Sequence, residues 1–560
     1  MKEKKNVFVL GSCHLFFALT FIFFAPMEVV LLNHTEFHYT IGSFWWFQLI
    51  LAFLAAGILT LVTMVLPRKA RTVIASLSLG AGAAAWAQTI FMNGKMVRLT
   101  GAEMNVSKTE TIVNLAIWIL IVAGIVIAAL LLERRGKKAG IWMSIAAGFL
   151  TALQLTAFLS LLMTTDFAAD SDTHSFTRKG EFELSSGTNV VVFLMDGADG
   201  EYVHQMMENY PELNEQLSGW VYYPNMTSKY SRTFPALTYM LSGGQNHLDV
   251  PVKEYVDTSF DNSDFLQNIY DAGTNIAIFT MDRSYISTSA DGIIANARKG
   301  ANRISDLNLI GLEKGLARIS LFKCLPYACK KLVSYDPAVL NIMAFKDRYY
   351  YWYDPYVYND FAGRDVMKTN GQYQKAFRFY HLWSAHRSAT WDDKLMMGKH
   401  EQPSYVRLRG SFLLLKTYCD EMKKLGVYDD ALIIVIADHG ESVGDPENLV
   451  QFRAACPLLM VKYPHSEETG QLTVSSAPIG QEDLFATITD ALEAKRPNVG
   501  SGRAIQEITE GEERERYYYY TAENARGTPK RMLEYVIRGD AENFDNWEET
   551  GNIWPALIDW

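Results

Sequence analysis

The sequence predicts a protein of two parts, an α-helical membrane domain followed by an α/β domain with a mostly parallel sheet between helices. Long apolar runs fall before Thr164, and short β-branched runs alternate with helical patterns after it. The charge also changes there, from a net +7 up to Thr164 to a net −17 in the remainder. The expected divisions are 1–164 for the membrane domain, 165–187 for a linker and 188–560 for the second domain.

Five apolar runs in the first part are long enough to cross a bilayer, which takes about 20 residues each. The alternative for the first run is a cleaved signal peptide, but Pro26-Met27-Glu28 is no small-residue cleavage site and four more runs follow. We therefore expect an integral membrane protein with five transmembrane helices. The runs are Val7–Phe24, Phe44–Leu66, Thr72–Met92, Thr111–Leu132 and Ile141–Met163.

The basic residues of the short loops predict how these helices are oriented. Basic loops stay on the cytoplasmic side. The amino terminus is therefore expected to be cytoplasmic, and the part after Met163 extracytoplasmic. The acidic balance of that outer part argues against nucleic acid as a partner. The basic residues in question are Lys2, Lys4, Lys5, Arg68, Lys69, Arg71, Arg134, Arg135, Lys137 and Lys138.

The five cysteines of the chain are few for a secreted disulfide scaffold. Cys324 and Cys329 lie close enough in sequence to form a disulfide in an oxidising compartment. Two free thiols are the alternative, because spacing alone does not determine how cysteines pair.

The second domain opens with the polar stretch Asp166–Gly187, which is typical of a linker. Helical patterns such as Tyr405–Leu425 lie between the apolar runs that follow. The tail segments Tyr517–Glu523 and Met532–Asp540 are expected to add edge strands to the same domain. The short apolar runs, each predicted to be a buried strand, are Val190–Met195, Asn275–Asp282, Phe377–Trp383, Leu432–Ala437 and Pro457–Pro464.

Two of these runs are followed by residue types that commonly serve as metal ligands. Asp196 follows the first run, and Asp438 with His439 follows the fourth. Ligands of parallel sheets bind beyond the carboxyl ends of the strands, so we expect these side chains to meet. Together they offer hard oxygen and nitrogen donors suited to Mn, Mg or Zn. The alternative for either aspartate alone is a turn residue or a helix cap.

A third segment carries hydroxyl groups and a proline, in the stretch "SRTFPALTYMLSGG" from Ser231 to Gly244. Counted from Thr233, it resembles the nucleophile signature of sulfatases, with Pro at +2 and Gly at +10 but Thr at the nucleophile position. With Asp196, "DHGE" (Asp438–Glu441) and "YHLWSAH" (Tyr380–His386), residues 188–463 resemble the sulfatase-like branch of the alkaline phosphatase superfamily. Lipoteichoic acid synthases and lipid A phosphoethanolamine transferases have a similar domain arrangement, with five transmembrane spans before such a domain.

This resemblance implies an alkaline phosphatase-like or sulfatase-like fold for the second domain and a nucleophilic role for Thr233. A threonine cannot yield formylglycine, and Leu237 stands where sulfatases have an arginine, so sulfatase chemistry of that kind is not expected. No histidine occurs between His439 and His465, which favours one divalent metal ion over two. Lipoteichoic acid synthases end their first strand in Glu rather than Asp. The implied metal ligands are Asp196, Thr233, Asp438 and His439.

Three further residues are candidates for substrate binding. His386 matches the substrate-side histidine of the phospho-transferring relatives, although a surface histidine is the alternative. Arg232 and Arg387 are candidates to hold a phosphodiester against the negative field of the domain. Ser231 and Thr238 carry rival hydroxyl groups, but neither stands at the nucleophile position of the signature.

The function predicted from these features is a membrane-anchored phosphotransferase. It would move a phosphoglycerol or phosphoethanolamine head group from a phospholipid donor to a surface glycan or lipid acceptor, through a phosphothreonine. One alternative is a sulfatase-like hydrolase or phosphodiesterase, in which water replaces the acceptor. Another is a catalytically silent sensor that binds lipid head groups.

Overall fold

The structure is a computed structural model of the whole chain. The chain falls into two compact units, which we call the helical unit (Met1–Thr173 with Gly300–Tyr349) and the α/β unit (His174–Lys299 with Tyr350–Trp560). The basic residues Lys137 and Lys138 and the first part of the expected linker, 166–173, lie outside the described residues. Those described are 2–33, 37, 39, 41–94, 106–135, 139–165, 174–299, 307–333, 340, 343–345, 353–387, 389–398, 400–441, 452–498, 500, 502–522 and 531–557.

Among its described residues, the helical unit contains five helices that are long and apolar enough to cross a membrane. They coincide with the five predicted runs, except that the first continues past Phe24 to Leu32 through a π-helical segment. The elements are α1 (Lys2–Ala18), η1 (Leu19–Phe24), α2 (Ala25–Leu32), α3 (Trp45–Met64), α4 (Arg68–Ala87), η3 (Gln88–Met92), α5 (Lys108–Arg134) and α6 (Ala139–Thr164).

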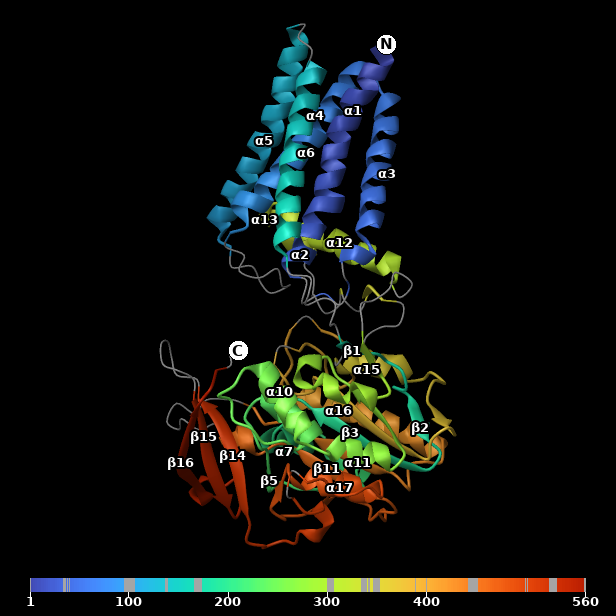
Figure 1. Cartoon of the computed structure of the whole chain (residues 1–560), viewed down its shortest axis with the longest axis vertical. Helices are drawn as coiled ribbons and strands as arrows, with labels where there is room; N and C mark the ends of the chain where they lie inside the picture. The colour runs from blue at the N-terminus through green and yellow to red at the C-terminus, as the bar shows by residue number, and fades with distance from the viewer. Residues whose placement is uncertain are drawn as a thin grey trace. The chain divides into compact units, whose positions relative to one another are not determined.

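A later segment also folds with the helical unit, in the helices α12 (Leu309–Cys324) and α13 (Tyr327–Lys330). Figure 1 shows α12 running across the end of the bundle near α2. Its apolar side chains Leu312, Leu316 and Ile319 join one buried cluster with residues of α2, and Lys323 forms an ion pair with Glu28. This differs from the expected single domain over 188–560, because apolar residues at helical spacing bury against the first long helix.

The two cysteines considered for a disulfide lie in or beside these helices. Cys324 and Cys329 are both free thiols in the structure, Cys324 buried and Cys329 partly exposed. The free-thiol alternative is therefore the one that the structure supports.

The α/β unit is built around a seven-stranded sheet of order β12-β4-β11-β10-β3-β9-β6. Strands β10, β3, β9 and β6 run parallel, but β11 is antiparallel to both of its neighbours. The sheet is therefore mixed, with β11 reversed among strands that otherwise run in one direction, because an apolar run does not reveal the direction of its strand. The bounds are β12 (Thr473–Val474), β4 (Trp220–Tyr222), β11 (Leu459–Lys462), β10 (Leu432–Ile436), β3 (Thr188–Met195), β9 (Lys375–Leu382) and β6 (Thr274–Phe279).

Helices cover both faces of this sheet (Figure 1). On β3, Val190 and Val192 belong to one buried cluster, whereas Val191 and Phe193 belong to the other. Burial on both faces explains the unbroken apolar runs of the sequence. The first face is covered by α9 (Thr233–Ser242), α10 (Val252–Asp261), α11 (Phe265–Asp271) and α17 (Asp483–Ala491), and the second by α7 (Gly200–Asn209), α15 (Asp354–Phe361) and α16 (Ser404–Lys424).

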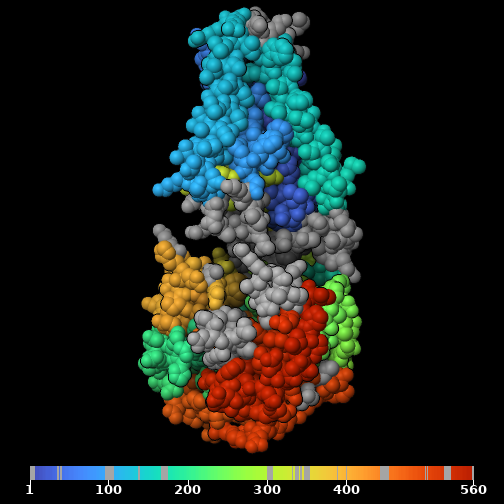
Figure 2. Space-filling model, turned by 90° about the vertical axis from the view of Figure 1, so that its left-hand side faces the viewer, coloured from blue at the N-terminus to red at the C-terminus, as the bar shows by residue number. Residues whose placement is uncertain are grey.

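Four smaller sheets complete the described part of the unit. Two strands, β1 (His174–Phe176) and β2 (Glu183–Ser185), lie within the stretch expected to be a linker, where they pair with β7 (Ala297–Lys299) and β8 (Lys368–Asn370). The strand β5 (Met226–Thr227) pairs with β13 (Ile479–Gly480). The tail forms a separate antiparallel sheet rather than edges of the large one, and its residues gather on one face of the unit, drawn in red in Figure 2. Its strands are β14 (Glu515–Ala522), β15 (Arg531–Arg538) and β16 (Trp547–Pro555).

Candidate active site

The predicted metal ligands meet at the carboxyl edge of the large sheet. Leu194 on β3 is paired with Ile436 on β10. Asp196 and Asp438 each follow this pair by two residues, so they leave the sheet at the same level. Asp196, Asp438 and His439 each offer a ligand atom, and these atoms lie within 4.8 Å of one another. All three side chains are buried. The register of two parallel strands thus produces the cluster.

Thr233, the first residue of α9, completes this cluster. Its Oγ1 lies 3.3 Å from Nε2 of His439. The rival hydroxyl groups are buried and occupied elsewhere. Ser231 Oγ accepts a hydrogen bond from the Thr521 amide, and Thr238 Oγ1 donates one to the Tyr285 carbonyl.

The backbone around His439 sets which ring nitrogen faces Thr233. Nδ1 of His439 lies 2.6 Å from the Gly440 carbonyl oxygen and donates to it, which leaves the Nε2 lone pair toward Thr233. A side chain at Gly440 would place its Cβ 2.0 Å from the Arg453 carbonyl oxygen. Glycine is therefore required at this position because the neighbouring chain passes so closely.

The two carboxylates create an electrostatic imbalance that a cation would relieve. Burial raises the pKa of Asp438, and the negative charge of Asp196 raises it further. Burial opposes ionisation of Asp196 as well, but the hydrogen bond from His381 and the nearby imidazoles hold the pKa of Asp196 below its ordinary value. Oδ1 of Asp196 and Oδ2 of Asp438 are buried and accept no hydrogen bond. These orphaned oxygens, with an imidazole nitrogen and a hydroxyl, fit a hard divalent ion.

A histidine that was not predicted supports Asp196 from the adjacent strand. His381 on β9 is fully buried, with Nε2 3.4 Å from Asp196 Oδ2 and Nδ1 3.0 Å from Thr280 Oγ1. Asp282 Oδ2 lies 3.6 Å from the same Nδ1, and burial raises the pKa of Asp282 to about 6. Burial lowers the pKa of a histidine, but the carboxylates around His381 outweigh it and raise its pKa.

The three predicted substrate-binding residues lie in different settings. The His386 backbone passes beside Gly197, which follows Asp196, and the His386 ring packs on Trp383 with centroids 4.2 Å apart. Arg387 is exposed, and its Nε forms an ion pair with Glu441 Oε1 at 2.7 Å. Arg232 directly precedes Thr233 and is partly exposed. Their roles in substrate binding stay predictions.

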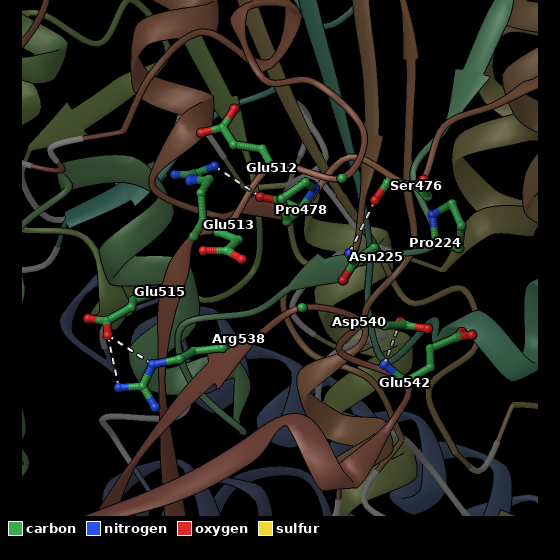
Figure 3. Close-up of a pocket in the computed structure, with 13 residues that line it drawn as sticks. Pro224, Asn225, Ser476, Pro478, Glu512, Glu513, Glu515, Arg538, Asp540 and Glu542 are labelled. Carbon is green, nitrogen blue, oxygen red and sulfur yellow. Dashed lines mark hydrogen bonds and ion pairs between the residues drawn. The ribbon is translucent and has the colours of Figure 1, made fainter.

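A separate cavity of about 840 Å³ lies between the tail sheet and the turns before β5 and β13 (Figure 3). None of the cluster residues lines it. Its lining is rich in carboxylates and holds two guanidinium groups, of which Arg514 pairs with Asp483, and Arg538 with Glu515 and Glu548. The acidic lining residues are Glu512, Glu513, Glu515, Asp540 and Glu542.

Comparison with known proteins gives similarity of structure alone. No family model and no curated protein matches the sequence. Similar solved structures include the phosphonate monoester hydrolase SpPMH from Silicibacter pomeroyi, at 14% identity and a TM-score of 0.36 over 63% of this chain and 87% of that one. A protein in the alkaline phosphatase superfamily from Vibrio parahaemolyticus is 13% identical, with a TM-score of 0.37 over 69% of this chain and 85% of that one.

The C-terminal periplasmic domain of EcEptC from Escherichia coli is a third similar structure. It is 12% identical, with a TM-score of 0.35 over 66% of this chain and 96% of that domain. These are likenesses of the backbone at low identity. The chemistry proposed below therefore rests on the residues of this chain.

Proposed function

We propose that this protein is a membrane-anchored, metal-dependent phosphotransferase with Thr233 as its nucleophile. The observation that carries the proposal is the convergence of the Thr233 hydroxyl, two buried carboxylates and His439 at one sheet edge. The hydroxyl lies 3.3 Å from the histidine of this cluster, and each of the two carboxylates has one buried oxygen without a hydrogen bond. The cluster is suited to in-line attack on a phosphoryl group.

A divalent ion such as Mn, Mg or Zn, held by Asp196, Asp438, His439 and Thr233, would lower the pKa of the threonine hydroxyl and neutralise phosphoryl charge. The chain itself orients the attacking oxygen. The Thr233 hydroxyl lies 3.3 Å from His439 Nε2, and the Nδ1 bond to the Gly440 carbonyl keeps the His439 ring in place. His381 in turn holds Asp196 from β9.

The reaction then proceeds in two balanced halves. In the first, Thr233 Oγ1 forms a bond to phosphorus, the bond from phosphorus to the diacylglycerol oxygen breaks, and the threonine proton ends on diacylglycerol. In the second, an acceptor hydroxyl on a surface glycan or lipid bonds to phosphorus, the bond from phosphorus to Thr233 Oγ1 breaks, and the proton of the acceptor hydroxyl returns to Thr233 Oγ1. The transferred group is phosphoglycerol or phosphoethanolamine. A lipid donor suits a chain whose amino-terminal part holds five apolar helices.

We further propose that the helical unit is integral to the plasma or inner membrane, with its amino terminus cytoplasmic and the α/β unit extracytoplasmic. The basic loops that motivate this orientation include Arg68 and Arg134, at the start of α4 and the end of α5. Labelling of introduced cysteines by an impermeant reagent tests it. Reaction of an α/β-unit cysteine in intact cells is expected, and protection of that cysteine would contradict the orientation.

The function is tested with purified full-length protein in vesicles of head-group-labelled phosphatidylglycerol or phosphatidylethanolamine, with Mn²⁺ and a glycan acceptor. We expect release of diacylglycerol and transfer of label, both lost in Thr233→Ala but retained in Ser231→Ala. Release of free head group without acceptor labelling would identify a hydrolase instead. Binding of the vesicles with no release would favour the silent sensor. Equal release by Thr233→Ala would exclude Thr233 as the nucleophile.

A further inference from the structure

A buried glutamine joins the two segments that form the candidate active site. Gln481 follows β13, and its side chain is fully buried. Its Oε1 accepts a hydrogen bond from the Lys229 amide at 2.8 Å, and its Nε2 donates one to the Asp438 carbonyl at 2.7 Å. Lys229 lies on the loop that leads into Thr233. A single side chain therefore bonds both to the loop that delivers the hydroxyl and to the strand end that delivers the carboxylate and imidazole.

The turn that carries Gln481 is itself held in place. The Gln481 amide donates to the Thr227 carbonyl at 3.1 Å, which extends the pairing of β13 with β5. The carboxylate of Asp483, also fully buried, accepts from the Gly480 amide at 2.8 Å and from both terminal nitrogens of Arg514 at 2.7 and 3.0 Å. These hydrogen bonds hold the turn in place. The side-chain amide of Gln481 therefore has little freedom to follow a shift of the loop before Thr233 or of the end of β10.

Other bonds anchor the same loop to different parts of the unit. The Ser228 amide donates to the Ala455 carbonyl at 2.9 Å, and the Tyr519 amide of β14 donates to the Lys229 carbonyl at 2.8 Å. Neither bond reaches the end of β10. The hydrogen bonds of the Gln481 side chain, by contrast, connect the loop backbone directly to Asp438.

We propose that Gln481 is a positioning residue that sets the separation between Thr233 and the Asp438–His439 pair. This inference rests on the proposed function, in which that separation matters for chemistry. The Thr233 hydroxyl and the His439 ring are 3.3 Å apart, so a shift of either segment by a fraction of that distance breaks the arrangement. Misplacement of reacting groups by about 1 Å costs on the order of 100-fold in rate. Loss of groups that orient metal ligands costs about 10–100-fold in affinity or activity.

The test compares Gln481→Met with the control Asn189→Leu in the full-length protein. Both changes replace a buried amide by an apolar side chain of similar size. Asn189 lies on β3 at the end away from the cluster, where its side chain bonds the Ser185 amide and the Ser185 and Gly187 carbonyls. Both variants are expected to lower the thermal midpoint, since each leaves buried backbone groups unpaired.

The two variants are expected to differ in chemistry. Gln481→Met should lower kcat for head-group transfer by about 10–100-fold with KM for the lipid nearly unchanged, and should weaken Mn²⁺ binding about tenfold. Asn189→Leu should leave all three within about twofold. If both variants lower the midpoint equally and change neither kcat nor Mn²⁺ affinity, Gln481 has a purely structural role. Should Gln481→Met fail to fold, Gln481→Asn, too short to keep both hydrogen bonds, is expected to show the same loss.

The Mn²⁺ titration separates failure of this inference from failure of the proposed function. If the wild type binds Mn²⁺ but transfers nothing, the transferase proposal fails, and the affinities of the two variants still decide the role of Gln481. If the wild type binds none of Mn²⁺, Mg²⁺ and Zn²⁺ in the same titration, the metal site is wrong and the positioning role falls with it.

Discussion

Neutralising one of the two buried carboxylates should have opposite effects on stability with and without a divalent ion. The ligand oxygens of Asp196 and Asp438 lie within 4.8 Å of each other. Two unit charges at that distance repel by about 3.5 kcal/mol at an effective dielectric constant of about 20. His381, whose pKa is raised by the same carboxylates, offsets part of this repulsion. We therefore expect Asp438→Asn to stabilise the protein by about 1–3 kcal/mol in the presence of a chelator.

The substitution should leave the rest of the site intact. The Asp438 Oδ1 atom accepts a hydrogen bond from the Gly197 amide at 3.3 Å, and asparagine retains an oxygen there. Asparagine is nevertheless a poorer ligand for a hard cation because it carries no charge. An ion at 100 times its dissociation constant stabilises the native wild type by about 2.7 kcal/mol. Most of this gain should be lost in the variant.

The assay is the thermal midpoint of the full-length protein in detergent, measured with EDTA and with saturating Mn²⁺. Asp438→Asn should unfold above the wild type in EDTA and below it in Mn²⁺. Asp430→Asn, a change at an exposed carboxylate that precedes β10, should alter neither midpoint. If Asp438→Asn is less stable than the wild type in both conditions by the same amount, the reasoning is refuted, because repulsion and ion binding would then both be absent.

Three further predictions follow from the surroundings of the site. Gly440→Ala forces a Cβ to within 2.0 Å of a backbone carbonyl oxygen, so transfer activity should fall at least tenfold. Gly371→Ala, with open space around it, should stay near wild type. Equal activities of the two variants would contradict the close contact at Gly440. Burial raises the pKa of Asp354 from 3.8 to about 6, so the folded state binds more protons than the unfolded state in that window. The stability of the wild type relative to Asp354→Asn should accordingly fall by at most about 3 kcal/mol as pH rises from about 4 to 6, and a pH-independent difference in thermal midpoint would refute this. If the Arg387 guanidinium holds a phosphodiester, Arg387→Ala should raise KM for the lipid donor several-fold at nearly constant kcat. An unchanged KM would mean that the guanidinium serves only in its ion pair with Glu441.

The central part of the site could be predicted because strand ends obey a simple geometric rule. Parallel strands bring their carboxyl ends to one edge, so Asp196, Asp438 and His439 were expected to meet, and they do. The same rule applies to His381 and Asp282, which stand near the ends of two other predicted strands. They were missed because a polar residue within or directly after an apolar run was taken as part of the strand.

Contacts between distant segments could not be predicted in this way. Gln481 lies in "IGQED", which has no periodic pattern, and its partners Lys229 and Asp438 are far away in sequence. The direction of β11 and the packing of α12 on the helical unit also depend on tertiary contacts. A hydrophobic pattern predicts that a face will be buried, but it does not identify the surface that will cover it.

A covalent intermediate on Thr233 is the most direct test of the account as a whole. The full-length protein is incubated with head-group-labelled phospholipid and Mn²⁺ without acceptor, quenched in acid and digested, and its peptides are analysed by mass spectrometry. We predict a phosphoglycerol or phosphoethanolamine adduct on Thr233 that disappears when acceptor is added and never forms in Asp438→Asn. Turnover with an unmodified Thr233 throughout, or an adduct on another residue, would contradict the mechanism.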